Sequence, residues 1–86
     1  MPTYITLYKW TEQGIKNVKA SPERVAASIQ AAEAAGIKVL GAYLVQGEYD
    51  LVGISEAPDE QTAVAAVLAQ GAQGFVRTTT MRAFSM

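Results

Sequence analysis

The pattern of apolar and polar positions along the chain predicts four β-strands. Residues 3–10 and 75–84 are rich in β-branched and aromatic types, which is typical of strands. Residues 37–45 and 51–55 form two further apolar runs, and the glycine-containing segment 47–50 lies between them. A short connection of this kind between two apolar runs indicates a β-hairpin.

Two helices are predicted between these strands. Residues 21–23 (Ser-Pro-Glu) supply a capping side chain, a first-turn proline and a first-turn acid. Apolar positions then recur with helical spacing, and Gly36 is expected to cap the C-terminus. Residues 58–60 (Pro-Asp-Glu) open the second helix in the same way, and Gly71 and Gly74 are expected to end it.

The predicted order is β-α-β-β-α-β over a single domain, residues 1–86. Right-handed crossovers then give a four-stranded antiparallel sheet with two helices on one face, which is the ferredoxin-like α+β arrangement. Residues 11–20, between the first strand and the first helix, are expected to form a polar connection.

The other face of such a sheet is left uncovered. The strand period of two places Tyr4, Tyr8 and Trp10 together on one face of the first strand. We expect this aromatic row to lie on the uncovered face, with a contribution from the last strand (Thr78, Thr80 and Phe84). An exposed face of this kind predicts association, so we expect a homodimer or higher homo-oligomer through the sheet faces.

Composition supports an oligomer and excludes several kinds of site. Half of the residues are hydrophobic and 17% are charged, which is much apolar surface for 86 residues to bury alone. The chain has no cysteine and no histidine, so we expect neither disulfides nor a thiolate or imidazole metal site, and no cofactor.

Charge and hydropathy exclude two classes of partner. The net charge is −1 and no basic patch dominates, so no nucleic-acid partner is expected. No apolar run reaches the roughly 18–20 residues of a membrane span, and no signal-peptide pattern opens the chain. A cytoplasmic location is therefore the expectation.

Several blocks of the sequence resemble the GYD-domain family of small bacterial and archaeal proteins. The hallmark is the Gly-x-Tyr-Asp pattern at residues 47–50. The opening segment 2–5, the segments 11–17 and 21–22, and the C-terminal blocks 56–59 and 76–84 are also similar to that family, so the resemblance covers essentially the whole chain.

The resemblance implies a dimeric α/β barrel, in which two ferredoxin-like sheets pack together. The hairpin is also similar to the effector-binding domains of Lrp/AsnC transcription regulators, which bind amino acids between subunits. No helix-turn-helix precedes the domain, so a complete regulator is not expected. The wider barrel group also includes cofactor-independent monooxygenases, muconolactone isomerases and haem proteins with a proximal histidine, a residue that this chain lacks.

Four side chains are candidates for binding a small molecule. Asp50 could act as a ligand-binding or general-base carboxylate with Tyr49 as a donor, although a hairpin aspartate also caps backbone N–H groups. Arg77 and Arg82 could clamp an anion or form salt bridges across a dimer. Their spacing of five places them on opposite faces of a strand, which argues against a single clamp.

The remaining chemistry leaves two hypotheses. The aromatic row could stack a planar ligand, but residues 51–55 lack the aromatic and basic residues of an RNA-recognition strand. Without histidine or cysteine, no nucleophile–base pair is evident, so no catalytic residue is assigned. We expect a non-catalytic oligomeric module for small-ligand binding or assembly. The alternative is a cofactor-independent enzyme, which would need a closed cavity with convergent polar groups.

Overall fold

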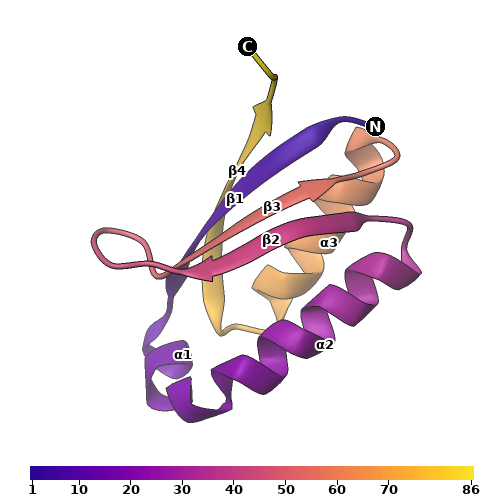
Figure 1. Ribbon diagram of the computed structural model, residues 1–86. Coiled ribbons are helices and arrows are strands. Elements are labelled where there is room, and N and C mark those ends of the chain that lie inside the picture. The colour runs from indigo at the N-terminus through magenta and orange to yellow at the C-terminus, as the bar shows by residue number, and fades with distance from the viewer.

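A computed structural model describes all 86 residues as one antiparallel sheet with its helices (Figure 1). The strand order is β2-β3-β1-β4, which confirms the ferredoxin-like α+β prediction. The elements in chain order are β1 (Thr3–Trp10), α1 (Glu12–Lys16), the 3-10 helix η1 (Val18–Ala20), α2 (Ser21–Ala34), β2 (Lys38–Leu44), β3 (Leu51–Glu56), α3 (Glu60–Ala72) and β4 (Val76–Ala83).

Helices α2 and α3 lie on the same side of the sheet, and α1 lies beyond the end of β1 (Figure 1). Helix α2 packs against the edge strand β2, and α3 packs against β4 at the opposite edge. The other side of the sheet has no helix over it (Figure 1). None of the helices is both long enough and apolar enough to cross a membrane.

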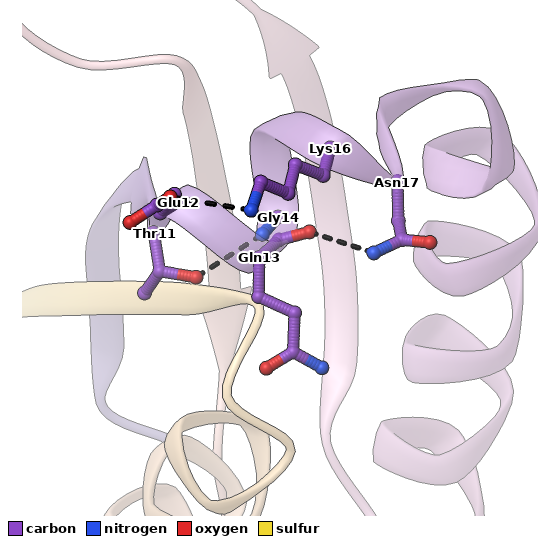
Figure 2. A network of polar contacts seen from close by, with 6 residues as sticks. All are labelled: Thr11, Glu12, Gln13, Gly14, Lys16 and Asn17. Carbon is purple, nitrogen blue, oxygen red and sulfur yellow. Dashed lines mark hydrogen bonds and ion pairs between the residues drawn. The ribbon is translucent and has the colours of Figure 1, made fainter.

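The segment 11–20 contains α1 and η1, so the prediction of a plain polar connection was wrong. The Thr11 hydroxyl accepts from the Gly14 N–H at 3.1 Å and caps α1 (Figure 2). A Glu12–Lys16 ion pair of 3.3 Å follows along the same turn (Figure 2). A capping threonine followed by an acid is a helix-start signal, but a five-residue helix with a central glycine leaves too short a pattern to detect.

Two hydrogen bonds tie this segment to the chain before β4. The Thr11 N–H donates to the Phe75 carbonyl at 3.0 Å, and its hydroxyl donates to the Gly74 carbonyl at 2.6 Å. Gly14 is buried at this junction, and a Cβ placed there would collide with the Phe75 carbonyl oxygen. The close approach of the two backbones therefore requires glycine at position 14.

The two long helices differ in how they begin. Ser21 was expected to cap α2, but it lies inside the helix, makes no capping bond and is buried. The 3-10 helix η1 leads directly into α2, so no exposed helix start is left for a side chain to cap. Helix α3 begins within the predicted segment 58–60, but Pro58 precedes the helix, and the Asp59 carboxylate caps it by accepting from the Thr62 N–H at 2.7 Å.

Helix α2 ends as predicted at a glycine. Gly36 has a φ of +87°, and its N–H donates to the Glu33 carbonyl at 3.0 Å. The Ile37 N–H donates to the Ala32 carbonyl at 2.9 Å, which completes a Schellman motif. This turn brings the chain back toward the sheet, and Ile37 enters the core just before β2.

The aromatic row of β1 faces the helices, so its predicted place on the uncovered face was wrong. Tyr4 is buried in a core cluster with Ile37, Ala57 and Ala63, and the last of these lies on α3. Residues with the same strand parity share this face. Tyr8 and Trp10 therefore point toward the helices as well.

Two more residues predicted on the uncovered face, Thr78 and Thr80 of β4, lie on the helix side because of the register of β4 with β1. Thr80 lies opposite Thr6 and Thr78 lies opposite Tyr8. The Thr6 and Thr80 hydroxyls lie 3.3 Å apart. Phe84 lies beyond β4 and is exposed.

The wrong face was predicted because periodicity shows which residues share a face of the sheet, but it does not show which face the helices cover. Alanine-rich helices leave space that large sheet side chains fill, and this decides the orientation.

The uncovered side of the sheet, which we call the open face, is aliphatic. Ile5 lies between Ile54 of β3 and Met81 of β4, and Leu7 lies opposite Val52. Tyr43 of the edge strand β2 is paired with Val52 and is exposed. The open face is therefore an apolar surface without a covering element in the monomer.

Replacement of Gly14 by alanine tests the junction between α1 and β4. We expect Gly14→Ala to lower the free energy of unfolding by about 1–3 kcal/mol, because the added methyl group forces the two backbones apart. Gly71→Ala is the matched control, because Gly71 lies within α3 with open space around it. Urea denaturation of both variants measures the difference. Equal stabilities for the two variants would contradict the close approach.

The Asp59 cap makes stability depend on pH. The hydrogen bond from the Thr62 backbone holds the pKa of Asp59 below its ordinary value of 3.8. A lowered folded-state pKa contributes stability above the unfolded value, and this contribution is lost as the pH falls through the folded value. We therefore expect wild type to lose more stability than Asp59→Asn between about pH 5 and pH 2. Urea denaturation across this range measures it, and parallel profiles would refute the prediction.

Candidate functional site

The Gly-x-Tyr-Asp hairpin is built around the backbone of Asp50. Gly47 has a φ of +122°, which an L side chain rarely adopts, so the connection between β2 and β3 depends on a glycine there. The Asp50 N–H donates to the Tyr8 carbonyl at 2.9 Å, and its own carbonyl accepts from the Val45 N–H at 2.9 Å. Asp50 thus joins the hairpin to β1.

The Asp50 carboxylate makes a second contact with β1. Its Oδ2 accepts from the Trp10 N–H at 2.9 Å, at the last residue of the strand. The Tyr49 ring lies 5.9 Å from Lys9 Nζ, within reach of a cation–π contact. Neither Tyr49 nor Asp50 lines the main cavity of the protein. The geometry therefore favours the structural interpretation of this pair over a general-base role.

The two strand arginines lie on opposite faces of β4, as their spacing predicts. Arg82 lies opposite Tyr4 on the helix side, and Arg77 lies opposite Lys9 on the open face. Arg82 forms a 3.6 Å ion pair with Glu60, an acid that the sequence did not single out, and its guanidinium lies 5.0 Å from the Phe84 ring centroid.

These four candidates do not converge. Arg82 lies opposite the start of β1, whereas Asp50 contacts the end of the same strand. A single anion or substrate therefore has no route to contact Asp50, Arg77 and Arg82 together.

A cavity of about 600 Å³ lies between the sheet and helices α2 and α3. Its walls are mainly apolar and include Val25 and Ile29 of α2 and Val67 of α3. From β1 it is lined by the row that the sequence identified as a possible platform for a planar ligand, namely Tyr4, Thr6, Tyr8 and Trp10. A cavity of this size is within the range of small-molecule sites.

Several polar groups at this cavity lack partners. Tyr4 Oη, Arg24 Nη2 and Gln70 Oε1 are shielded from solvent without a hydrogen bond, although all three residues line the cavity. Buried polar groups of this kind usually have a partner. Burial also raises the pKa of the Tyr8 hydroxyl, so this group stays protonated well above neutral pH.

The sequence identified the aromatic row but missed the other cavity residues. Arg24 and Gln70 are isolated polar residues on the two long helices, and such residues usually face solvent. Phe75 was assigned only to a strand. A signal existed in the helix composition, since alanine on both long helices leaves space above large sheet side chains.

Comparison with known proteins assigns the family. A family model described as the GYD domain matches residues 4–86. This chain belongs to the GYD-domain family. This chain is 37% identical over 84 residues to a Thermus thermophilus protein named "Glutamine synthetase and cystathionine beta-lyase binding protein". The alignment covers 96% of this chain and 88% of that relative.

Solved structures with the same fold are also found. The crystal structure of FFRP-DM1 has a TM-score of 0.70 and 21% identity, with coverage of 98% of this chain and 100% of the other. The crystal structure of TTHA0845 from Thermus thermophilus has a TM-score of 0.59 and 28% identity, with coverage of 100% and 96%. At 21% identity, the similarity to FFRP-DM1 is evidence for the fold alone.

Substitution of Asp50 separates its structural role from a ligand-binding one. We expect Asp50→Ala to lower the free energy of unfolding by about 1–2 kcal/mol in the absence of any ligand, because the Trp10 N–H loses its acceptor. Asp50→Asn keeps an acceptor oxygen and should retain most of the stability. Chemical denaturation measures both, and wild-type stability for Asp50→Ala would reopen a ligand-binding role.

Proposed function

We propose that this GYD-domain protein is a non-catalytic module that binds a metabolic enzyme and acts as a homodimer. The observation that carries the proposal is its 37% identity, over nearly the whole chain, to a relative named for binding glutamine synthetase and cystathionine beta-lyase. Both chains are small, and this one offers more surface suited to association than to chemistry.

The open face supports self-association. The monomer exposes 5794 Å², whereas a compact protein of 9.2 kDa exposes roughly 4,900 Å². The excess of about 900 Å² is on the scale of the ~800 Å² that each partner buries in a standard interface, although part of it lines the cavity. Only seven residues are buried within the monomer, so a second sheet packed on Ile5, Leu7 and Val52 would add a larger core.

The cavity is relevant to the alternative function, a cofactor-independent enzyme, because such an enzyme needs a cavity for its substrate. Its size fits that expectation, but its lining includes no aspartate or glutamate that could act as a base. Tyr8 is held protonated by burial and is therefore a poor base near neutral pH. These observations favour ligand binding over catalysis in the cavity.

Lysine substitutions on the open face test the dimer. We expect wild type to sediment at about twice 9.2 kDa at micromolar concentration and the double variant Leu7→Lys/Val52→Lys at about 9.2 kDa, since association would bury two neighbouring positive charges on each open face without partners. Ala31→Lys, at an exposed position of α2, is the matched control. Circular dichroism verifies folding. A wild-type monomer would overturn the proposed dimer.

Direct binding tests the enzyme partner. Purified glutamine synthetase and cystathionine β-lyase from the same organism would each be immobilised and titrated with this chain. We expect saturable binding to at least one enzyme with a Kd of about 10 μM or tighter, or about −7 kcal/mol. An unrelated enzyme of similar size and charge is the control. Absence of binding to both enzymes would refute the enzyme-docking proposal and leave the dimer as a separate question.

A further inference from the structure

One charged side chain lines the cavity between the sheet and the helices, and that side chain is Arg24 of α2. Its guanidinium lies 4.2 Å from the centroid of the Phe75 ring, and its Nη1 donates to the Asn17 carbonyl at 2.9 Å. Neither of the two ion pairs in the chain involves Arg24. Arg24 is therefore a cation beside apolar walls without a carboxylate counter-ion.

The second terminal nitrogen of Arg24 is available to an anion. Its Nη2 is shielded from water and has no hydrogen-bond partner, whereas Nη1 is already engaged with Asn17. A shielded donor on a charged group is costly when it lacks a partner. Carboxylates are the anions that match the planar guanidinium, and their hydrogen bonds to it are strengthened by charge.

Aromatic rings lie at the same end of the cavity. The backbone carbonyl of Phe75 and the Cβ of Trp10 both lie close to Gly14, so these two residues are neighbours, and the Phe75 ring lies against the Arg24 guanidinium. Both rings line the cavity, together with Tyr8. Ring walls of this kind favour a flat aromatic body, because offset-stacked and edge-to-face contacts add to the burial of apolar surface.

The remaining polar groups of the cavity are neutral. They are hydroxyls and amides, such as Thr6, Ser28 and Gln70, and no acid of the chain contributes to the lining. A ligand with a negative head group would therefore meet one positive charge and no opposing carboxylate. A neutral or cationic aromatic molecule would leave Arg24 without its counter-ion.

We propose that this cavity binds a small aromatic carboxylic acid. Its carboxylate pairs with Arg24, and its ring lies against Trp10, Phe75 and Tyr8. The site is separate from the Tyr49–Asp50 hairpin and lies on the opposite side of the sheet from the open face. The inference does not depend on a dimer or on an enzyme partner.

The test compares two probes of nearly equal shape. 2-Naphthoate carries the carboxylate, and 2-naphthamide replaces it with a neutral amide. Isothermal titration calorimetry gives the affinities, and the indole N–H signal of Trp10, the one tryptophan of the chain, reports the location in ¹H–¹⁵N spectra. We expect 2-naphthoate to bind at one site per chain, to shift the Trp10 signal, and to bind at least about tenfold more tightly than the amide.

Two variants examine the site itself. Arg24→Gln should weaken 2-naphthoate binding by about tenfold or more and leave 2-naphthamide binding unchanged. Ser28→Phe, one turn further along α2, should occupy part of the cavity beside Arg24 and weaken the binding of both probes, with the melting temperature as the check on folding. Ala27→Phe is the matched control, since Ala27 is exposed and does not line the cavity.

Three results would overturn the proposal: no saturable binding of 2-naphthoate to wild type, equal affinity for the two probes, or unchanged 2-naphthoate binding by Ser28→Phe. If Arg24→Gln fails to fold, the comparison of probes on wild type and the Ser28→Phe result still decide the matter. The single variant Leu7→Lys, at an open-face position outside the cavity lining, should bind 2-naphthoate as wild type does. Loss of binding there would place the probe at the dimer interface and would also refute the cavity site.

Discussion

The structure depends on how one face of β1 packs against two alanine-rich helices. Tyr4, Thr6, Tyr8 and Trp10 project from the centre of the sheet toward α2 and α3, and the helices offer mostly small side chains in return. Near Tyr4, the residues Ile37, Ala57 and Ala63 form the buried core cluster and also line one part of the cavity. The space between the layers is not filled, and the cavity extends along the row from Tyr4 to Trp10 between the sheet and the helices.

This packing gives the two sides of the sheet different properties. The helix side combines rings, hydroxyls and one guanidinium without a counter-ion around a partly open cavity, which suits recognition of a small molecule. The open face presents aliphatic side chains such as Ile5, Leu7 and Ile54 in register across three strands, which suits a second flat apolar surface. Because successive strand residues alternate between the faces, each side of the sheet can be altered by substitutions that leave the other side unchanged.

Local signals in the sequence were sufficient to predict the order of the four strands and the two long helices. They were insufficient to predict which face of the sheet the helices cover. The start of α3 within residues 58–60 and the glycine at the end of α2 were predicted because these signals depend on a few neighbouring residues. Helix α1 was missed because five residues with a central glycine carry almost no periodicity. The face of the aromatic row was predicted wrongly because alternation fixes relative positions only, and the choice between faces is made by packing against the helices.

The candidate site was harder to predict for a related reason. Tyr49 and Asp50 stand out in the sequence as a motif, whereas Arg24 and Phe75 are 51 positions apart and meet only after the sheet and helix layers have assembled. A contact between layers has no sequence period, so no local pattern could have indicated it. The spacing of Arg77 and Arg82 was informative because both lie on one strand, where geometry follows directly from residue number.

The hairpin motif that defines the family nevertheless has a connection to the cavity. The Asp50 carboxylate holds the N–H of Trp10, and the Asp50 N–H holds the carbonyl of Tyr8, so one residue fixes the backbone on both sides of Lys9. The side chains of Tyr8 and Trp10 are cavity walls. Asp50 thus acts on the helix side of the sheet through the backbone of β1, without touching the cavity.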